Sequence, residues 1–149
     1  MPAATLAPGH AVGPRMNSLL ASLSTADYDR LADALEAVPM RLGDRLYEPG
    51  VQLRHACFAG TAVLSLHYVT ENGSSAQTIG VGREGVVGIP LFMGGDTTSS
   101  SAVVHTGGHG WRMDRRRLMQ EFLRGDTLQS TLLRYTQALM TQITQTAAC

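Results

Sequence analysis

The side chains best able to bind a metal in this 149-residue chain are its histidines and its two cysteines. His55 and Cys57 alternate along a predicted strand and therefore lie on one face of it. His105 and His109 flank a predicted turn, and His67 lies on another predicted strand. Imidazole and thiolate groups are the ligands that zinc and haem iron prefer. Since nothing in this spacing requires a metal and polar-faced strand histidines are common, we expect no metal and no other cofactor.

The cysteines and serines also argue against other kinds of chemistry. Cys57 and Cys149 stand 92 positions apart, which supplies neither an iron–sulfur cluster nor a secreted disulfide framework. The run Ser99–Ser101 has no nucleophile elbow, and no histidine and aspartate are arranged to serve it. The His-x-His pattern of enzymatic cupins is missing as well. We therefore expect a protein of the reducing cytoplasm that is not an enzyme and has no catalytic residue.

Arginine carries all of the positive charge, because the chain has twelve arginines and no lysine. Twelve acidic residues balance them to a formal net charge of zero, whereas a compact nucleic-acid-binding domain usually has a basic excess. Asp114 precedes the run Arg115–Arg117 on a predicted helix, where three consecutive side chains point in different directions. We interpret this run as a solvated face, with a contact to another domain as the less favoured alternative.

Composition and the N-terminal segment indicate one soluble domain. At 44% hydrophobic residues, a chain of this length has enough apolar material for a core. Residues 1–15 are rich in proline, alanine and glycine and lack the charged start and long apolar run of a signal peptide, so we predict a flexible tail. No stretch approaches the roughly 18 apolar residues of a membrane span. These features predict a cytoplasmic protein with no membrane partner.

Two short helices are predicted to open the fold. The first covers Met16–Leu23, and Ser24 is placed to cap the second, with Asp27 as its acidic capping partner. Pro39 is predicted to end the second helix. Its core-facing stripe recurs at spacings of four and three and consists of Leu31, Leu35 and Val38.

Between Met40 and Met113 the chain is rich in glycine and its apolar runs shorten to strand length. Turns are predicted at Asn72-Gly73 and Gly107-Gly108, as hairpins, and at Glu48-Pro49-Gly50. Short strands at such intervals favour a closed or sandwiched all-β body over a parallel sheet. Arg45–Tyr47 leads into the Glu48-Pro49-Gly50 turn, and the predicted strands cover His55–Phe58, Thr61–Thr70, Gln77–Val81, Ser101–Thr106 and Gly110–Met113.

Helices return at the end of the chain. Asp114 is predicted to cap a helix through Phe122, which Gly125 ends before a long helix over Asp126–Ala147. Because Arg134 is the only cation of the long helix, we expect it to bury against both the β body and the same helix of a second copy, as a homodimer. Packing within one chain alone is the alternative. The main apolar stripe consists of Leu128, Leu132, Tyr135, Leu139 and Ile143, and an adjoining face adds Leu133, Met140 and Ala147.

Helices, a glycine-rich β body and a long terminal helix, in this order, resemble the sensor half of the Crp/Fnr superfamily of bacterial transcription regulators. The resemblance implies a mainly β fold with flanking helices: a double-stranded β-helix or jelly roll of cyclic-nucleotide-binding type, followed by a long dimerisation helix. In the family a winged helix-turn-helix domain follows, which is absent from this chain. The matching stretches run from about Met16 to the C-terminus: Leu42–Asp44, Leu46–Gly50, Phe58 with Gly60 and Val63, Gly82–Gly88, Leu91-Phe92 with Gly94-Gly95, and Leu133–Gln137.

The resemblance also implies an effector pocket, in which members that bind cyclic AMP use a glutamate for the ribose and an arginine for the phosphate. Here Ile89 follows Gly88 at the glutamate position, and the arginine position falls near Ser100. No arginine occurs between Arg83 and Arg112. Hydroxyl groups cannot neutralise a phosphate, so we expect this pocket not to bind cyclic AMP or cyclic GMP in the usual way. The predicted pocket residues are Gly88, Ile89, Ser99, Ser100, Ser101 and Ala102.

Whether an unrelated ligand or nothing occupies this pocket stays open. Glu84 is an alternative partner for a ribose, although charged loop residues are more often solvated.

The predicted organisation is a flexible tail over residues 1–15, a β-roll sensor domain with N-terminal helices over 16–125, and a dimerisation helix over 126–149. We predict the effector-sensing and dimerisation part of a Crp/Fnr-like regulator, which would contact DNA only through a domain outside this chain. The alternative is a stand-alone β-roll that binds a ligand or a protein partner and has no DNA-binding activity.

Overall fold

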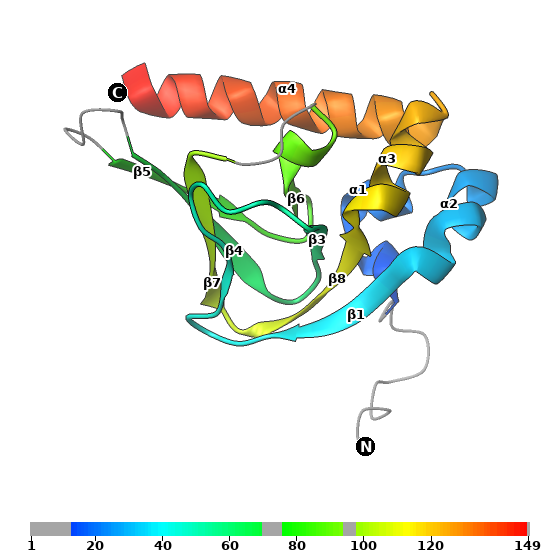
Figure 1. Ribbon diagram of the computed structural model, residues 1–149, viewed down its shortest axis with the longest axis horizontal. Coiled ribbons are helices and arrows are strands. Elements are labelled where there is room, and N and C mark those ends of the chain that lie inside the picture. The colour runs from blue at the N-terminus through cyan, green and yellow to red at the C-terminus, as the bar shows by residue number, and fades with distance from the viewer. Residues whose placement is uncertain (1–12, 70–75, 94–97, 149) are drawn as a thin grey trace.

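The computed structural model describes residues 13–69, 76–93 and 98–148, and it contains two four-stranded antiparallel sheets. One sheet has the strand order β1-β8-β3-β6 and the other the order β2-β7-β4-β5 (Figure 1). The strands are β1 (Leu35–Met40), β2 (Arg45–Tyr47), β3 (His55–Ala59), β4 (Val63–Val69), β5 (Ala76–Val81), β6 (Val86–Val87), β7 (Ser100–Thr106) and β8 (Gly108–Asp114). The helices are η2 (Pro14–Met16), α1 (Ser18–Ala21), α2 (Thr25–Leu31), η3 (Ala32–Ala34), η4 (Ile89–Leu91), α3 (Arg115–Leu123) and α4 (Thr127–Ala148).

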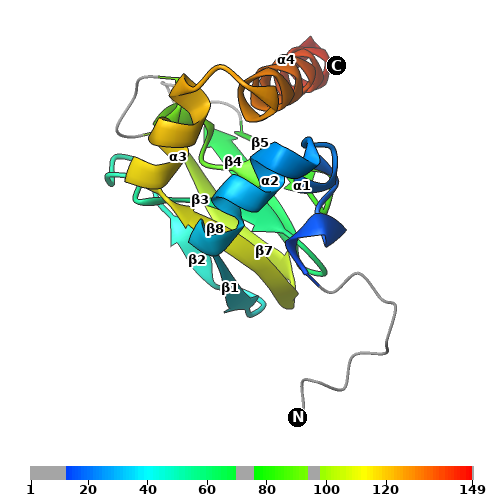
Figure 2. The same ribbon diagram turned by 90° about the vertical axis from the view of Figure 1, so that its right-hand side faces the viewer.

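Strand β3 lies in the middle layer of the molecule and is covered on both faces. Ala56 and Phe58 belong to an apolar cluster shared with the helices, whereas Cys57 and Ala59 face the other sheet. Side chains alternate along a strand, so each face receives every second residue. This double burial explains why the β3 sequence is a continuous apolar run. The two sheets form a sandwich, as the sequence predicted, with α1, α2 and α3 beside one sheet and α4 along another side of the β body (Figure 2).

The second predicted helix ends earlier than the sequence pattern indicated. Helix α2 stops at Leu31, and Leu35–Met40 form strand β1, which pairs with β8. The spacing of Leu35 and Val38 therefore belongs to a strand, and the prediction that Pro39 stops a helix was wrong. Because β1 is an edge strand, Pro39 can lie within it although it lacks an N–H.

The predicted final hairpin was also wrong. Strands β7 and β8 follow one another in the chain but belong to different sheets, so the chain crosses between layers at Gly107. A Cβ atom on Gly108 would lie 2.6 Å from the backbone nitrogen of Ala62, which is why this crossing needs a glycine. The Asn72-Gly73 turn lies outside the described residues; the strands on either side of it, β4 and β5, pair antiparallel.

The buried Asn17 side chain fastens the N-terminal helices to the sheets. Its Oδ1 accepts hydrogen bonds from the N–H groups of Leu19 and Leu20, which caps α1. Its Nδ2 donates to the carbonyl oxygens of Ala59 and Gly85, each at 2.9 Å. These four hydrogen bonds satisfy a polar side chain that is fully buried, a role the sequence pattern did not indicate.

The C-terminal helices begin and end close to their predicted bounds. The Oδ2 atom of Asp114 accepts from the N–H groups of Arg116 and Arg117 and so caps α3. Gly125, with a φ of 76°, turns the chain into α4, which lies along one side of the β body (Figure 1). None of the described helices is long and apolar enough to cross a membrane.

Candidate functional site

A pocket of about 170 Å³ lies between the β body and α4. One wall comes from the sheet β2-β7-β4-β5, a second from the segment Val86–Pro90 around η4, and a third from α4. No aspartate, glutamate or arginine lines it among the described residues. The sheet contributes Tyr47, Leu66, Tyr68 and Ser100 with the nearby Thr98, and α4 contributes Thr136, Leu139, Met140 and Ile143.

Three of the six predicted pocket residues line this pocket: Gly88, Ile89 and Ser100. The other three, Ser99, Ser101 and Ala102, do not line it. Ser99 is exposed, and Ser101 lies on the opposite strand face from Ser100, in register with His67 of β4. Ala102 is buried in the core between the sheets.

Gly88 shapes the wall of the pocket at the start of η4. Its φ of 105° is rare for residues with a side chain, and a Cβ atom here would lie 3.1 Å from the Cα of Ala56 and from the carbonyl oxygen of His55. The backbone at Gly88 therefore packs directly on β3, and Ile89 next to it begins the single turn of η4.

Two tyrosines that the sequence did not indicate occupy the polar corner of the pocket. Ser100 forms side-chain hydrogen bonds with both Tyr47 and Tyr68, and its Oγ lies 2.9 Å from the Oγ1 of Thr98. Burial raises the pKa of both phenols above the usual value, so they stay neutral and polar near neutral pH. Uncharged hydroxyl groups that bond to one another therefore occupy the corner around Ser100, near which the sequence resemblance places the arginine of members that bind cyclic AMP.

Tyr135 links α4 to the segment that leads into the pocket. Its hydroxyl bonds to the backbone of Val86, and burial raises the pKa of the phenol to about 12. A Cβ atom on Gly85 would lie 2.5 Å from the Tyr135 hydroxyl oxygen, so this close approach requires glycine. Movement of the η4 segment would therefore change its contacts with Tyr135 and so affect the position of α4.

The predicted apolar stripe of α4 packs against the chain's own body. Its members are buried or half-buried: Leu128, Leu132, Tyr135, Leu139 and Ile143. Leu133 lies on the outer face instead and is 43% exposed. Met140 is 58% exposed and also contributes to the lining of the pocket.

The candidate metal-binding side chains do not come together in the described residues, where no group of three or more could hold an ion. Burial raises the pKa of the Cys57 thiol to about 11, which makes it a poor ligand and nucleophile. His67 bonds to Thr78, and His109 bonds to Thr61. Glu84 lies outside the pocket and accepts a hydrogen bond from the N–H of Gly82 in its own turn.

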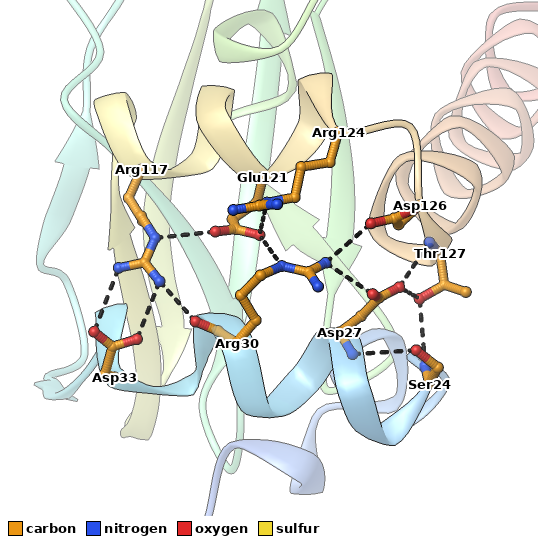
Figure 3. A network of polar contacts seen from close by, with 9 residues as sticks. All are labelled: Ser24, Asp27, Arg30, Asp33, Arg117, Glu121, Arg124, Asp126 and Thr127. Carbon is orange, nitrogen blue, oxygen red and sulfur yellow. Dashed lines mark hydrogen bonds and ion pairs between the residues drawn. The ribbon is translucent and has the colours of Figure 1, made fainter.

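At the other end of α4, a network of ion pairs surrounds the buried side chain of Glu121 on α3 (Figure 3). Its oxygens accept from the Nε atoms of Arg30 at 3.0 Å, Arg117 at 3.1 Å and Arg124 at 3.2 Å. Burial raises the pKa of this carboxyl, but the hydrogen bonds from Arg30 and Arg117 outweigh it, and the pKa lies below its usual value. Arg117 also pairs with Asp33 at 3.1 Å, which ties α3 to the segment after α2.

Asp27 ties α2 to the first turn of α4. Its carboxylate accepts from Arg30 at 2.7 Å, from the N–H of Thr127 at 2.9 Å and from the Thr127 hydroxyl. Hydrogen bonds from Thr127, against the effect of burial, and from Arg30 lower the pKa of Asp27 to about 2. The expected cap of α2 by Ser24 is present, since its Oγ accepts from the Asp27 N–H. The Asp27 carboxylate does not complete that cap; the Ser24 N–H donates to the hydroxyl of Thr127.

No family model and no curated protein matches the sequence of this chain, so its likeness to known proteins is one of structure. A regulatory subunit of a cAMP-independent protein kinase A from Trypanosoma brucei superposes with a TM-score of 0.67 over 81% of this chain and 43% of that one, at 18% identity. The N-terminal domain of a transcriptional regulator from Streptomyces coelicolor A3(2) superposes with a TM-score of 0.61 over 91% of this chain and 94% of that one, at 18% identity. The catabolite activator protein of Thermus thermophilus superposes with a TM-score of 0.63 over 87% of this chain and 59% of that one, at 14% identity.

This chain has the cyclic-nucleotide-binding β-roll fold. Its structural neighbours include Crp/Fnr-type transcription regulators, as the sequence resemblance predicted. The three proteins compared above are regulators or parts of regulators. This chain spans less than half of the kinase regulatory subunit and 59% of the catabolite activator protein.

Proposed function

We propose that this β-roll is a non-catalytic sensor domain whose pocket holds a small uncharged ligand and reports its presence through α4. One observation carries the proposal: the pocket is closed by Thr136, Leu139, Met140 and Ile143, all of them on α4. Any occupant would therefore touch the helix and the sheets at once. A ligand that prefers one placement of α4 shifts the population of that placement by its difference in affinity.

The charge of the pocket argues against cyclic nucleotides. A cyclic phosphate needs a cation beside it, and guanidinium groups provide this in bidentate form. In this pocket the hydroxyl groups of Tyr47, Tyr68 and Ser100 lie where such a cation would be needed. Ile89 stands at the position of the ribose-binding glutamate. One structural neighbour is itself named as cAMP-independent, and a triple variant of that protein, in which one change replaces threonine by arginine, is bound to cAMP.

The first experiment is calorimetric titration of the chain with cyclic AMP and cyclic GMP. We expect no saturable binding to the unaltered protein, and a sub-micromolar dissociation constant for either nucleotide would overturn the proposal. Ile89→Glu with Ser100→Arg, which places both missing charges in the pocket, is expected to bind cyclic AMP measurably. Circular dichroism of the double variant checks that it is folded.

The pocket favours a compact apolar ligand with one polar group. Its volume of about 170 Å³ lies below the roughly 300–1,000 Å³ of pockets for drug-sized ligands. Indole is a suitable probe, because it is apolar and carries a single N–H donor. In a methyl-detected NMR titration we expect the signals of Ile89, Leu139 and Ile143 to shift together, and Leu139→Phe, which fills the pocket, to abolish the shifts. Shifts spread over surface methyl groups, or equal shifts in the filled variant, would contradict a pocket for such ligands.

We also propose that α4 pairs with the same helix of a second copy. Leu133 and Met140 lie seven residues apart on its outer face, which is the spacing of a coiled-coil seam, and both are exposed in the single chain. Sedimentation velocity at tens of micromolar should show a dimer. Leu133→Ala with Met140→Ala should weaken it by at least about tenfold, since two apolar seam positions are lost. Gln145→Ala is the matched control, because Gln145 is exposed and lies on a different face of α4 from Leu133 and Met140. A strictly monomeric protein would exclude this dimer.

In a Crp/Fnr-like regulator, the placement of α4 would be read by a DNA-binding domain joined to its C-terminal end. The presence of this fold in the Streptomyces coelicolor and Thermus thermophilus regulators supports that role. The alternative is a stand-alone β-roll that binds a ligand or a protein without contacting DNA. The gene sequence distinguishes them: a helix-turn-helix pattern after residue 149 supports the regulator, and a stop codon there favours the alternative.

A further inference from the structure

A second and larger hollow, of about 560 Å³, lies away from the ligand pocket, where the segment before β3 meets the start of α3. Gln52, Leu53 and Arg54 form one wall, and the first turns of α3 with the capping Asp114 form the other. Figure 2 shows α3 beside the ends of β3 and β8, which bring these two segments together. Arg115 and Arg116 both contribute to the helical wall.

A neighbouring hollow of about 330 Å³ shares Gln52, Leu53 and Arg54 with it. The second hollow lies between the edge strands β1 and β2 of the two sheets. Apolar side chains contribute much of its lining, among them Val38, Met40, Leu46 and Val51. We call these two adjoining hollows together the arginine groove, with a basic part at α3 and an apolar part at the sheet edges.

The arginine groove concentrates the positive charge of a neutral molecule. Five of the twelve arginines line it, namely Arg45, Arg54, Arg112, Arg115 and Arg116, against Asp114 as the one carboxylate in its walls. Asp114 already accepts hydrogen bonds from backbone N–H groups of α3.

Carboxylates beside the arginine groove neutralise only some of its cations. Arg112 pairs with Glu36 at 2.8 Å, and Arg45 pairs with Glu48 at 3.3 Å. Within the described residues, the guanidinium groups of Arg54 and Arg116 form no hydrogen bond and no ion pair. Both side chains are exposed and are therefore available to a partner.

We infer that the arginine groove binds an acidic, partly apolar peptide segment of a partner protein. Exposed guanidinium groups bind carboxylates in bidentate form, and the adjoining apolar floor suits the leucine-like side chains of the same segment. Inorganic phosphate would not contact the apolar part of the groove, so a phosphate ligand fits the site less well. A nucleic acid would need a wider basic surface than a chain of zero net charge offers. The arginine groove shares Tyr47 with the ligand pocket, but none of its arginines lines that pocket, so failure of this inference would leave the proposed function standing.

The test uses a short fluorescein-labelled peptide of alternating aspartate and leucine, followed by fluorescence anisotropy. We expect the unaltered chain to bind it, and Arg54→Gln with Arg116→Gln to weaken binding by at least about tenfold, since two charge-assisted contacts are lost. Arg41→Gln with Arg134→Gln removes the same charge from exposed positions outside the groove, and we expect it to change affinity by less than about twofold. Thermal melting of all variants confirms that they fold.

Three competitors identify the ligand class. The same peptide with lysine in place of aspartate should not bind, and inorganic phosphate should displace the acidic peptide only at far higher concentration. A short DNA duplex should compete weakly. The inference is overturned if the acidic peptide fails to bind, if the control variant loses as much affinity as the groove variant, or if phosphate or DNA binds the groove more tightly than the peptide.

Discussion

The beginning and the end of α4 contact the β-roll through different kinds of interaction. At its beginning, Thr127 forms a hydrogen bond with Asp27. Leu128 and Leu132 are buried there in the apolar cluster between the helices and the sheet β1-β8-β3-β6. Farther along, Leu139 packs on the second cluster, between the sheets, and the half-buried Ile143 lies over the ligand pocket. Hydrogen bonds and ion pairs are directional and fix one arrangement, whereas apolar contact alone tolerates sliding and tilting. We therefore expect the beginning to act as an anchor and the end to move when the pocket is filled.

The largest expected effect is the loss of Leu132, which joins α4 to the helical cluster and is fully buried. Leu132→Ala should lower the free energy of unfolding by about 4 kcal/mol, because it leaves a cavity that the surroundings do not fill. Leu123→Ala removes the same atoms from a side chain that is 69% exposed and should cost less than about 0.5 kcal/mol. Urea unfolding of both variants measures the difference; equal costs would show that α4 is not anchored here.

Next comes the buried carboxylate of Glu121. Glu121→Gln should lower the free energy of unfolding by about 3 kcal/mol, since Arg30, Arg117 and Arg124 lose their shared anion. Glu48→Gln, which breaks an exposed pair with Arg45, should cost less than about 1 kcal/mol. If the Glu121 variant is as stable as the Glu48 variant, the network contributes no more to the anchor than a surface ion pair.

The pH dependence of stability isolates the contact between Asp27 and Thr127. The pKa of Asp27 is about 2 in the folded chain against an ordinary value of 3.8, so its contribution is fully present above about pH 4 and is lost as the pH falls toward 2. A shift of this size corresponds to about 2 kcal/mol. Asp27→Asn should therefore be less stable than the unaltered protein at pH 6, with the gap narrowing at pH 2.5. Melting temperatures at both pH values measure it, and a constant gap would rule out this linkage.

The smallest effects are expected at the end of α4. Ile143→Ala should cost about 1 kcal/mol, because the side chain is only half-buried and borders a pocket, and Thr144→Ala on the exposed face should be neutral. Hydrogen exchange gives a direct comparison of the two ends. Amides near Ile143 should exchange faster than those near Leu132, and indole should slow the former alone. Equal protection along the helix would contradict the division into an anchored beginning and a movable end.

Much of the fold followed from local patterns. The cap at Asp114, the break at Gly125 and the apolar stripe of α4 each depend on neighbouring residues, and the structure has all three. The pattern of Leu35 and Val38 misled because an edge strand and a helix can both accommodate two apolar residues three positions apart. The local sequence does not distinguish a helix from an edge strand here; pairing with β8 decides for the strand.

The sequence by itself determined that residues 84–111 bring no arginine to the ligand pocket and that Ile89 follows Gly88. Only the tertiary structure decided what fills the space, since Tyr47, Tyr68 and Ser100 come from three strands far apart in the chain. The same holds for the arginine groove, in which tertiary structure brings Arg54, just before β3, close to Arg116 on α3. Residue type sets the chemistry that a site can have, while contacts between distant segments set which residues share it.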